Sequence, residues 1–175
     1  ETLPFPARTP KPPAGSHPIQ TTAAATTAST EVVRAIAKPR APLPAEADSA
    51  SISTFSFIVY GDTRGRRDGN EPQYEHSLVV DGMLATIKQL DTSDAPVRFV
   101  LQSGDAVVNG RDPKQWNVSF VDLINRLTTE GGVPYFLAPG NHDVTAVADL
   151  TSPERAKGLR NYLQAVGDLI PPDTA

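Results

Sequence analysis

The stretch VPYFLAPGNHD, residues 133–143, decides how the rest of this chain is interpreted. It joins a short apolar run, typical of a buried strand, to a glycine that is followed by Asn141, His142 and Asp143. Asn141 offers a metal ligand and His142 offers a proton donor or acceptor. The carboxylate of Asp143 could orient the histidine ring. The stretch therefore predicts a strand that ends in a functional loop.

Two earlier segments repeat this layout of an apolar run, a glycine and a polar residue. Residues 55–62 read FSFIVYGD, and residues 97–105 read VRFVLQSGD. The short length of both apolar runs, and their β-branched and aromatic residues, favour buried strands. Three predicted strands therefore each end in a glycine and a ligand-type residue.

Helical patterns separate the predicted strands. A first helix is expected over residues 77–90, a second is expected to begin at Asp112 and end before residues 131–132, and a third covers residues 152–166. The alternation of strand and helix predicts an α/β fold with a parallel sheet, in which ligands bind beyond the carboxyl ends of the strands. All three glycine-led motifs are expected at that edge.

The first 52 residues differ from the rest in composition. Residues 1–52 hold nine of the seventeen prolines and an Ala/Thr-rich run, and they contain few large apolar groups to offset the entropy of ordering. We therefore expect a disordered Pro/Ala/Thr-rich tail over residues 1–52, in which residues 31–38 could form a short helical turn. The folded region is expected over residues 53–175.

Composition argues against several classes of protein. A net charge of −4 argues against a general nucleic-acid or anionic-membrane surface, and the absence of cysteine excludes disulfides and thiolate zinc sites. No apolar run approaches the roughly 20 residues needed to span a bilayer. The first residue is Glu1 rather than methionine, and together with the tail composition this favours an exported protein, periplasmic or extracellular.

The side chains at the expected site suit hard divalent metal ions. Asp62, Asp105 and Asn141 supply oxygen ligands, and His142 supplies a nitrogen base or acid. Such a set suits Mn, Fe, Zn or Mg, and two ions about 3.5–4 Å apart would activate a water molecule and hold a phosphoryl group. Taken singly, Asp62 and Asp105 could instead be ordinary turn residues, since aspartate after glycine is common in loops.

Taken together, the three motifs resemble those of the calcineurin-like metallophosphoesterase family. The segments GDTR at 61–64, GDAVVNG at 104–110 and GNHD at 140–143 are similar to the family's D-x-H, G-D-x-x-x-x-G and G-N-H-[DE] motifs, in the same order. The resemblance implies the first β-α-β-α-β-α half of an αββα sandwich. It also implies hydrolysis of a phosphate mono- or diester, a small-molecule substrate, with two divalent metal ions as cofactors.

The resemblance also implies a role for each matching residue. Asp62 is expected to bind the first metal ion, and Asp105 is expected to bridge both ions. Asn141 is expected to bind the second ion through its amide oxygen. His142 would lie beside the phosphate as a proton donor or a transition-state contact, held in orientation by Asp143.

The sequence departs from the family pattern at Arg64. Most members have a histidine two residues after the first aspartate, so this chain lacks one ligand of the first ion there. Arg64 could instead hold a substrate oxyanion through its fork of donors. His76, near the start of the first predicted helix, is a candidate substitute ligand; the alternative is that it is a capping or solvated residue.

Further histidines that the family carries downstream are also absent. The chain contains only His17, His76 and His142, and none follows Asp143. We therefore expect the N-terminal half of a metallophosphoesterase domain that is inactive alone, exposes an apolar sheet face and needs a C-terminal half or a partner chain. The alternative is a non-catalytic binding or structural module with a degraded site.

Overall fold

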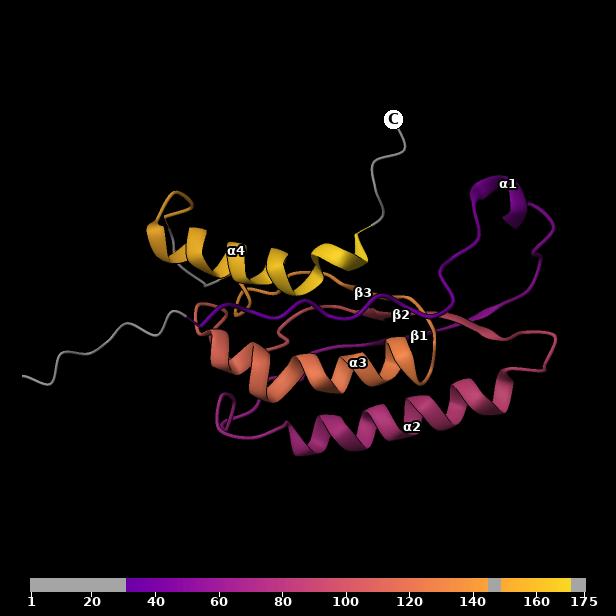
Figure 1. Cartoon of the computed structure of the whole chain (residues 1–175), viewed down its shortest axis with the longest axis horizontal. Coiled ribbons are helices and arrows are strands. Elements are labelled where there is room, and N and C mark those ends of the chain that lie inside the picture. Colours follow the sequence, from indigo (N-terminus) through magenta and orange to yellow (C-terminus); the bar gives the residue numbers. More distant parts are fainter. Residues whose placement is uncertain (1–30, 145–148, 171–175) are drawn as a thin grey trace, which may run out of the picture. The chain divides into compact units, whose positions relative to one another are not determined.

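Three parallel strands form the framework of the structure, a computed structural model that describes residues 31–144 and 149–170. The strands are β1 (Ser56–Tyr60), β2 (Val97–Gln102) and β3 (Tyr135–Leu137), in the spatial order β1-β2-β3 (Figure 1). Val59 of β1 pairs with Leu101 of β2, which pairs with Phe136 of β3. The α/β fold with a parallel sheet that the sequence predicts is confirmed.

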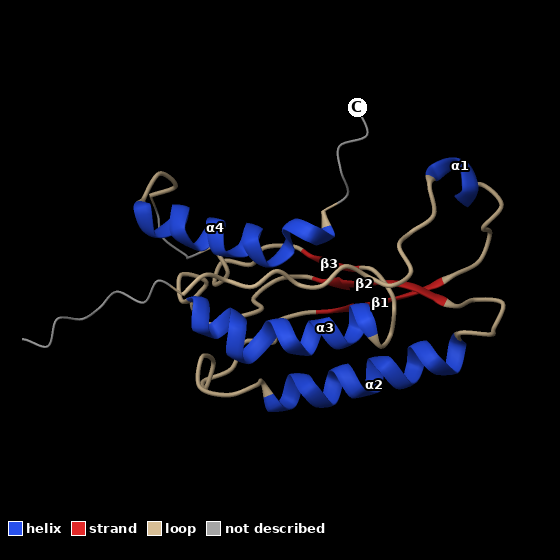
Figure 2. Cartoon of the chain, in the orientation of Figure 1, coloured by secondary structure: helices blue, strands red, loops and turns tan. Residues whose placement is uncertain are grey.

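A helix follows each strand, as the sequence predicts. The helices are α1 (Glu46–Ser49), α2 (Tyr74–Leu90), α3 (Val121–Thr129) and α4 (Pro153–Val166), with a π-helical turn, η1 (Gln115–Phe120), and a 3-10 turn, η2 (Gly167–Leu169). Helix α2 follows β1, η1 and α3 follow β2, and α4 follows β3 (Figure 2). In the described part of the chain, none of these helices is long and apolar enough to cross a bilayer.

Apolar patterning and capping residues determine where the helices form. The inward face of α2 consists of side chains spaced three or four positions apart, namely His76, Val80, Met83 and Ile87. Ile124 and Leu127 of α3 are fully buried in the same core. Helix α4 begins at Pro153 because the Ser152 hydroxyl accepts the Arg155 N–H at 3.2 Å, which is the N-cap that the sequence predicts.

Residues 31–41 pack against the folded region, which corrects the predicted end of the disordered tail. They run between α3 and α4, in indigo in Figure 1, and Val33 and Ile36 are buried in the core. The Ile36 N–H donates to the Ala165 carbonyl of α4 at 2.8 Å. The prediction for residues 1–30 lies outside the described residues.

A side chain from η1 keeps this segment extended. Asn117 accepts the Arg34 N–H at 2.8 Å and donates to the Val32 carbonyl at 2.9 Å, so that its amide pairs with the backbone as a neighbouring strand would. These bonds satisfy backbone groups that a helix would otherwise pair internally. The helical turn predicted at residues 31–38 therefore does not form.

One face of the sheet is apolar and open among the described residues, as the sequence predicts. Phe57 and Val59 of β1 are 51% and 60% exposed. The Phe57 ring stacks on Phe99 of β2 with the ring centroids 5.3 Å apart, and Phe99 also contacts Phe136 of β3. Contiguous apolar patches of this kind mark surfaces that another element or chain covers.

Candidate active site

Three glycine-led turns meet where β1, β2 and β3 end. The Asp62 N–H donates to the Gly104 carbonyl at 3.0 Å, which joins the first turn to the second. Gly104 has a φ of 106°, and a Cβ atom at this position would lie 2.5 Å from the Gly140 nitrogen of the third turn. Only glycine permits both this backbone conformation and this close approach. The site therefore depends on tight backbone packing as well as on its polar side chains.

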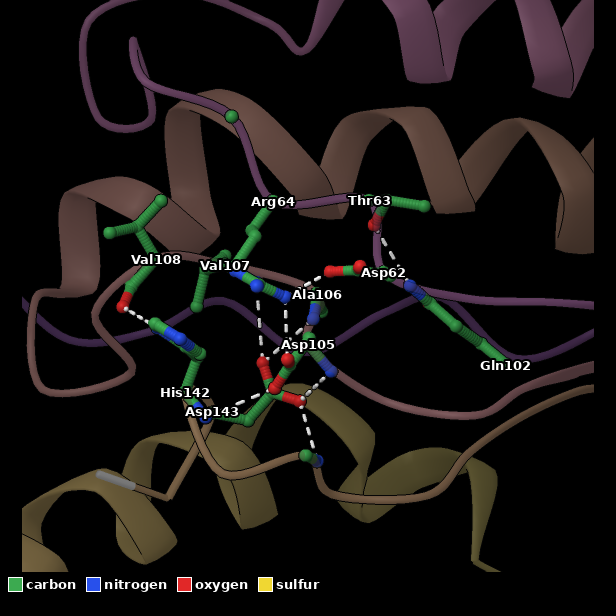
Figure 3. A network of polar contacts seen from close by, with 12 residues as sticks. Asp62, Thr63, Arg64, Gln102, Asp105, Ala106, Val107, Val108, His142 and Asp143 are labelled. Carbon is green, nitrogen blue, oxygen red and sulfur yellow. Dashed lines mark hydrogen bonds and ion pairs between the residues drawn. The ribbon is translucent and has the colours of Figure 1, made fainter. Parts of the chain in front are cut away.

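Asp143 holds the second and third turns together. Its fully buried carboxylate accepts four backbone N–H groups, from Asp105 at 2.8 Å, Ala106 at 2.9 Å, Val107 at 3.2 Å and Gly140 at 2.9 Å (Figure 3). Burial raises the pKa of this carboxyl group, and the four N–H donors oppose that effect. Asp143 is thus a structural acceptor for the backbone of the site.

The imidazole of His142 is oriented by a carbonyl group, which corrects the role predicted for Asp143. His142 Nδ1 lies 2.8 Å from the Val108 carbonyl oxygen, and the His142 N–H donates to Asp105 Oδ1 at 3.1 Å (Figure 3). A carbonyl oxygen only accepts, so Nδ1 carries the proton in this contact. In the neutral ring, Nε2 is then left to accept a proton or to contact a substrate.

Arg64 lies between two carboxylates of the site. Its Nη1 donates to Asp62 Oδ1 and, at 2.5 Å, to Asp105 Oδ2 (Figure 3). The Asp62 side chain is 71% exposed, whereas that of Asp105 is 18% exposed. Both predicted aspartates therefore contact the same positively charged group, which is the guanidinium of Arg64.

Asn141 is exposed beside these residues. The structure gives its side chain no hydrogen-bond partner among the described residues. Its amide oxygen is therefore free to contact a ligand. The carboxylate of Asp143, by contrast, already accepts four backbone N–H groups. The four predicted residues Asp62, Asp105, Asn141 and His142 thus come together at one edge of the sheet.

Among the described residues, His76 forms no hydrogen bond with these four side chains, and its predicted role as a metal ligand gains no support. Its Nε2 is 3.1 Å from the Tyr60 hydroxyl and its Nδ1 is 2.9 Å from Gln73 Oε1, so both ring nitrogens already have partners. The side chain is buried on the inward face of α2 and packs against the Phe120 ring. Burial lowers the pKa of His76 to about 4, which keeps the ring neutral.

The neutral state of His76 predicts how stability depends on pH. The folded-state pKa is about 4 and the ordinary value is 6.5, so protons bind the unfolded chain first as the pH falls. The free energy of unfolding should therefore drop as the pH falls from 6.5 towards 4, by about 2 kcal/mol between about pH 7 and pH 5 from this group. Urea unfolding at both pH values should show this loss in the wild type but not in His76→Gln. A His76→Gln variant that kept the full loss would contradict the assignment.

Asp68 is a residue of the site that the sequence analysis missed. Its buried carboxylate accepts the Gly65 N–H at 3.1 Å, the Val108 N–H at 3.0 Å and Gln73 Nε2 at 3.0 Å. It therefore fixes the loop after β1 to the turn that orients His142. The only signal in the sequence was the Asp-Gly pair at residues 68–69, which is typical of any exposed turn.

A hollow of ≈ 830 Å³ opens beside Asp62 and Arg64. It is lined by the loop after β1 and by the first turns of α2, namely residues 60–68, 71–76 and 79. Its lining includes Arg66 and Arg67 as well as Arg64. The hollow provides room for a group larger than a phosphate next to the carboxylates.

A parallel α/β sheet that gathers ligand-type side chains at the carboxyl ends of its strands defines a class of ligand-binding or catalytic domains. A family model described as calcineurin-like phosphoesterase matches residues 55–172. Because this match covers more than half of the chain, the chain belongs to the calcineurin-like phosphoesterase family, as the three motifs indicate. Comparisons with curated proteins and with solved structures gave no match.

Members of this family generally use divalent metal ions, and the described residues supply only part of a site for them. Within residues 31–144 and 149–170 no three His, Asp or Glu side chains are grouped as a metal would require. Arg64 lies between Asp62 and Asp105, and Asp105 Oδ1 already accepts the His142 N–H. These residues alone therefore do not fit a two-metal centre.

Proposed function

We propose that this chain forms the phosphate-facing part of a metal-dependent phosphoesterase site that acts on a phosphate mono- or diester. The observation that carries the proposal is the convergence of the three glycine-led turns, with Asp62, Asp105 and His142, at one edge of the sheet. The hollow beside Asp62 would accept the organic part of the ester. Membership of the phosphoesterase family supports the reaction type.

We propose different roles for His142, which would contact the ester, and for Asp105 and Asn141, which would contact a metal ion. His142 would meet the ester through Nε2, because its Nδ1 is held by the Val108 carbonyl. Asp105 and Asn141 are the residues of this chain that we propose to contact a divalent ion, with Mn, Fe, Zn or Mg as candidates. When bound, such an ion supplies Lewis acidity and an activated water molecule.

The missing ligands are proposed to come from outside the described residues. A further segment or a partner chain that packs on the open sheet face would lie next to the same edge. The exposed Phe57 and Val59, which are costly to leave in water, support this proposal. On this account residues 1–175 alone have little or no turnover.

The second candidate is a non-catalytic binding or structural module with the same fold. The position of Arg64 favours it, since a guanidinium between Asp62 and Asp105 neutralises the carboxylates that a metal would use. The free side chain of Asn141 and the orientation of the His142 ring, which leaves Nε2 without a partner among the described residues, favour the enzyme.

Hydrolysis of p-nitrophenyl phosphate and of its bis ester with Mn²⁺ separates the two candidates. In the protein expressed from the complete coding sequence, we expect turnover that a chelator abolishes and that Asn141→Ala lowers by about 100-fold or more. Asn70→Ala, which removes an exposed asparagine of the loop after β1, is the matched control and should retain activity. Activity that survives both the chelator and Asn141→Ala would rule out the metal-dependent mechanism. Robust turnover by residues 1–175 alone would contradict the proposed division of ligands.

A further inference from the structure

We infer that Arg64 is a built-in cation that takes the place of a divalent metal ion between Asp62 and Asp105. Its Nη1 contacts one oxygen of each carboxylate, which is the position of an ion shared by two aspartates. This inference concerns metal binding alone, so it stands or falls independently of whether the chain hydrolyses any ester.

The backbone delivers Arg64 to this position. The Thr63 and Arg64 N–H groups both donate to the Asp105 carbonyl at 3.1 Å, so the start of the loop after β1 is fixed on the turn after β2. Gln102 Nε2 donates to the Thr63 hydroxyl at 2.9 Å and fixes the neighbouring side chain. The backbone of Arg64 is therefore bonded to Asp105, the residue whose carboxylate its guanidinium group contacts.

The other arginines of the same loop are arranged differently. Arg66 is exposed, and Arg67 pairs with Glu71 at 2.8 Å on the surface. Only Arg64, among these three, contacts Asp62 or Asp105 in the described structure. The contact is thus specific to one position and does not reflect a general excess of positive charge in the loop.

Electrostatics explains why a cation is needed there. Two carboxylates that face the same point repel each other unless a positive charge lies between them. A guanidinium group supplies that charge permanently and donates planar hydrogen bonds that match carboxylate oxygens. A divalent ion could bind this pair only by displacing Arg64, so the pair should bind metal weakly in the wild type.

Calorimetric titration with Mn²⁺ tests the inference on the 175-residue chain. Arg64→Met keeps the aliphatic stem and removes the charge, and it should bind Mn²⁺ at least about tenfold more tightly than the wild type. Arg66→Met is the matched control and should bind as the wild type does. The gain should disappear when Asp62→Asn is added to Arg64→Met, because the new site requires that carboxylate.

Two outcomes would overturn the inference. The first is an Arg64→Met variant that is folded but binds Mn²⁺ no more tightly than the wild type. The second is a tenfold loss of Mn²⁺ affinity in Asp62→Asn with Arg64 left unchanged, which would show that Asp62 already holds a metal. The inference predicts that this variant binds Mn²⁺ as the wild type does. The second measurement decides the question even if Arg64→Met does not fold.

Discussion

Replacing Gly110 by alanine should lower the free energy of unfolding by about 3 kcal/mol or more, because the new methyl group has no space. A Cβ atom at Gly110 would lie 1.7 Å from the Asp143 carbonyl oxygen and 2.4 Å from its carbonyl carbon. Both atoms are backbone and cannot rotate away. The Gly110 N–H also donates to the His142 carbonyl at 3.0 Å, so any shift at Gly110 displaces the turn that carries His142.

Gly82 provides the matched control for this substitution. It lies in α2, and apart from its chain neighbours and the adjacent backbone of the same helix, no atom lies within 4 Å of the position of a Cβ. Gly82→Ala should therefore raise the free energy of unfolding by about 0.5–1 kcal/mol, since alanine loses less backbone entropy than glycine in a helix. Urea unfolding of both variants measures the two effects. A Gly110→Ala variant as stable as the wild type would show that the second and third turns are farther apart than the structure places them.

Replacing Asp143 by alanine should cost about 3–5 kcal/mol of stability, because four backbone N–H groups lose one shared acceptor. Those of Ala106 and Val107 are buried and would have no water to bond with. Asp143→Asn should be less damaging, since it keeps one acceptor oxygen but turns an NH₂ group towards the same donors.

The control for Asp143 is an aspartate in a surface ion pair. Asp122 is exposed and pairs with Arg34 at 2.9 Å, so Asp122→Ala should cost less than about 1 kcal/mol. Urea midpoints and slopes for these variants give the comparison. If Asp143→Ala and Asp122→Ala destabilised the chain equally, Asp143 would not be the group that holds the turns.

The strands were predictable from local sequence, but their limits were predicted correctly only for β2. The run at residues 97–102 became β2 without change, whereas the predicted strand at residues 133–138 shortened to β3, Tyr135–Leu137. Pro134 cannot donate a ladder hydrogen bond, although its carbonyl accepts the Val100 N–H at 2.9 Å. Helix α2 begins three residues earlier than predicted, at Tyr74.

The glycine-led motifs predicted that Asp62, Asp105 and His142 lie close together, but they indicated neither Asp68 nor the contacts of Asp143 and His76. The sequence showed that Asp143 follows His142, and it did not show that its carboxylate reaches the N–H groups of residues 105–107. Likewise, the sequence predicted His76 as a metal ligand or as a capping or solvated residue, whereas its burial and its partners Tyr60 and Gln73 depend on tertiary packing.

The N-terminal segment was missed for a related reason. Residues 31–41 have a weak apolar pattern, and only Val33 and Ile36 reach the core. Their backbone bonds to groups far along the chain, among them the amide of Asn117, more than eighty residues away, and the carbonyl of Ala165. No local rule of composition predicts a partner at such a distance.

Mapping inorganic phosphate by ¹⁵N NMR, with and without Mg²⁺, tests most directly the claim that the three turns form a single phosphate-facing site. We expect chemical-shift changes that cluster at residues 61–65, 104–109 and 140–143 and that are lost in Asp105→Asn. Changes confined to other surfaces, or a full response in Asp105→Asn, would contradict it.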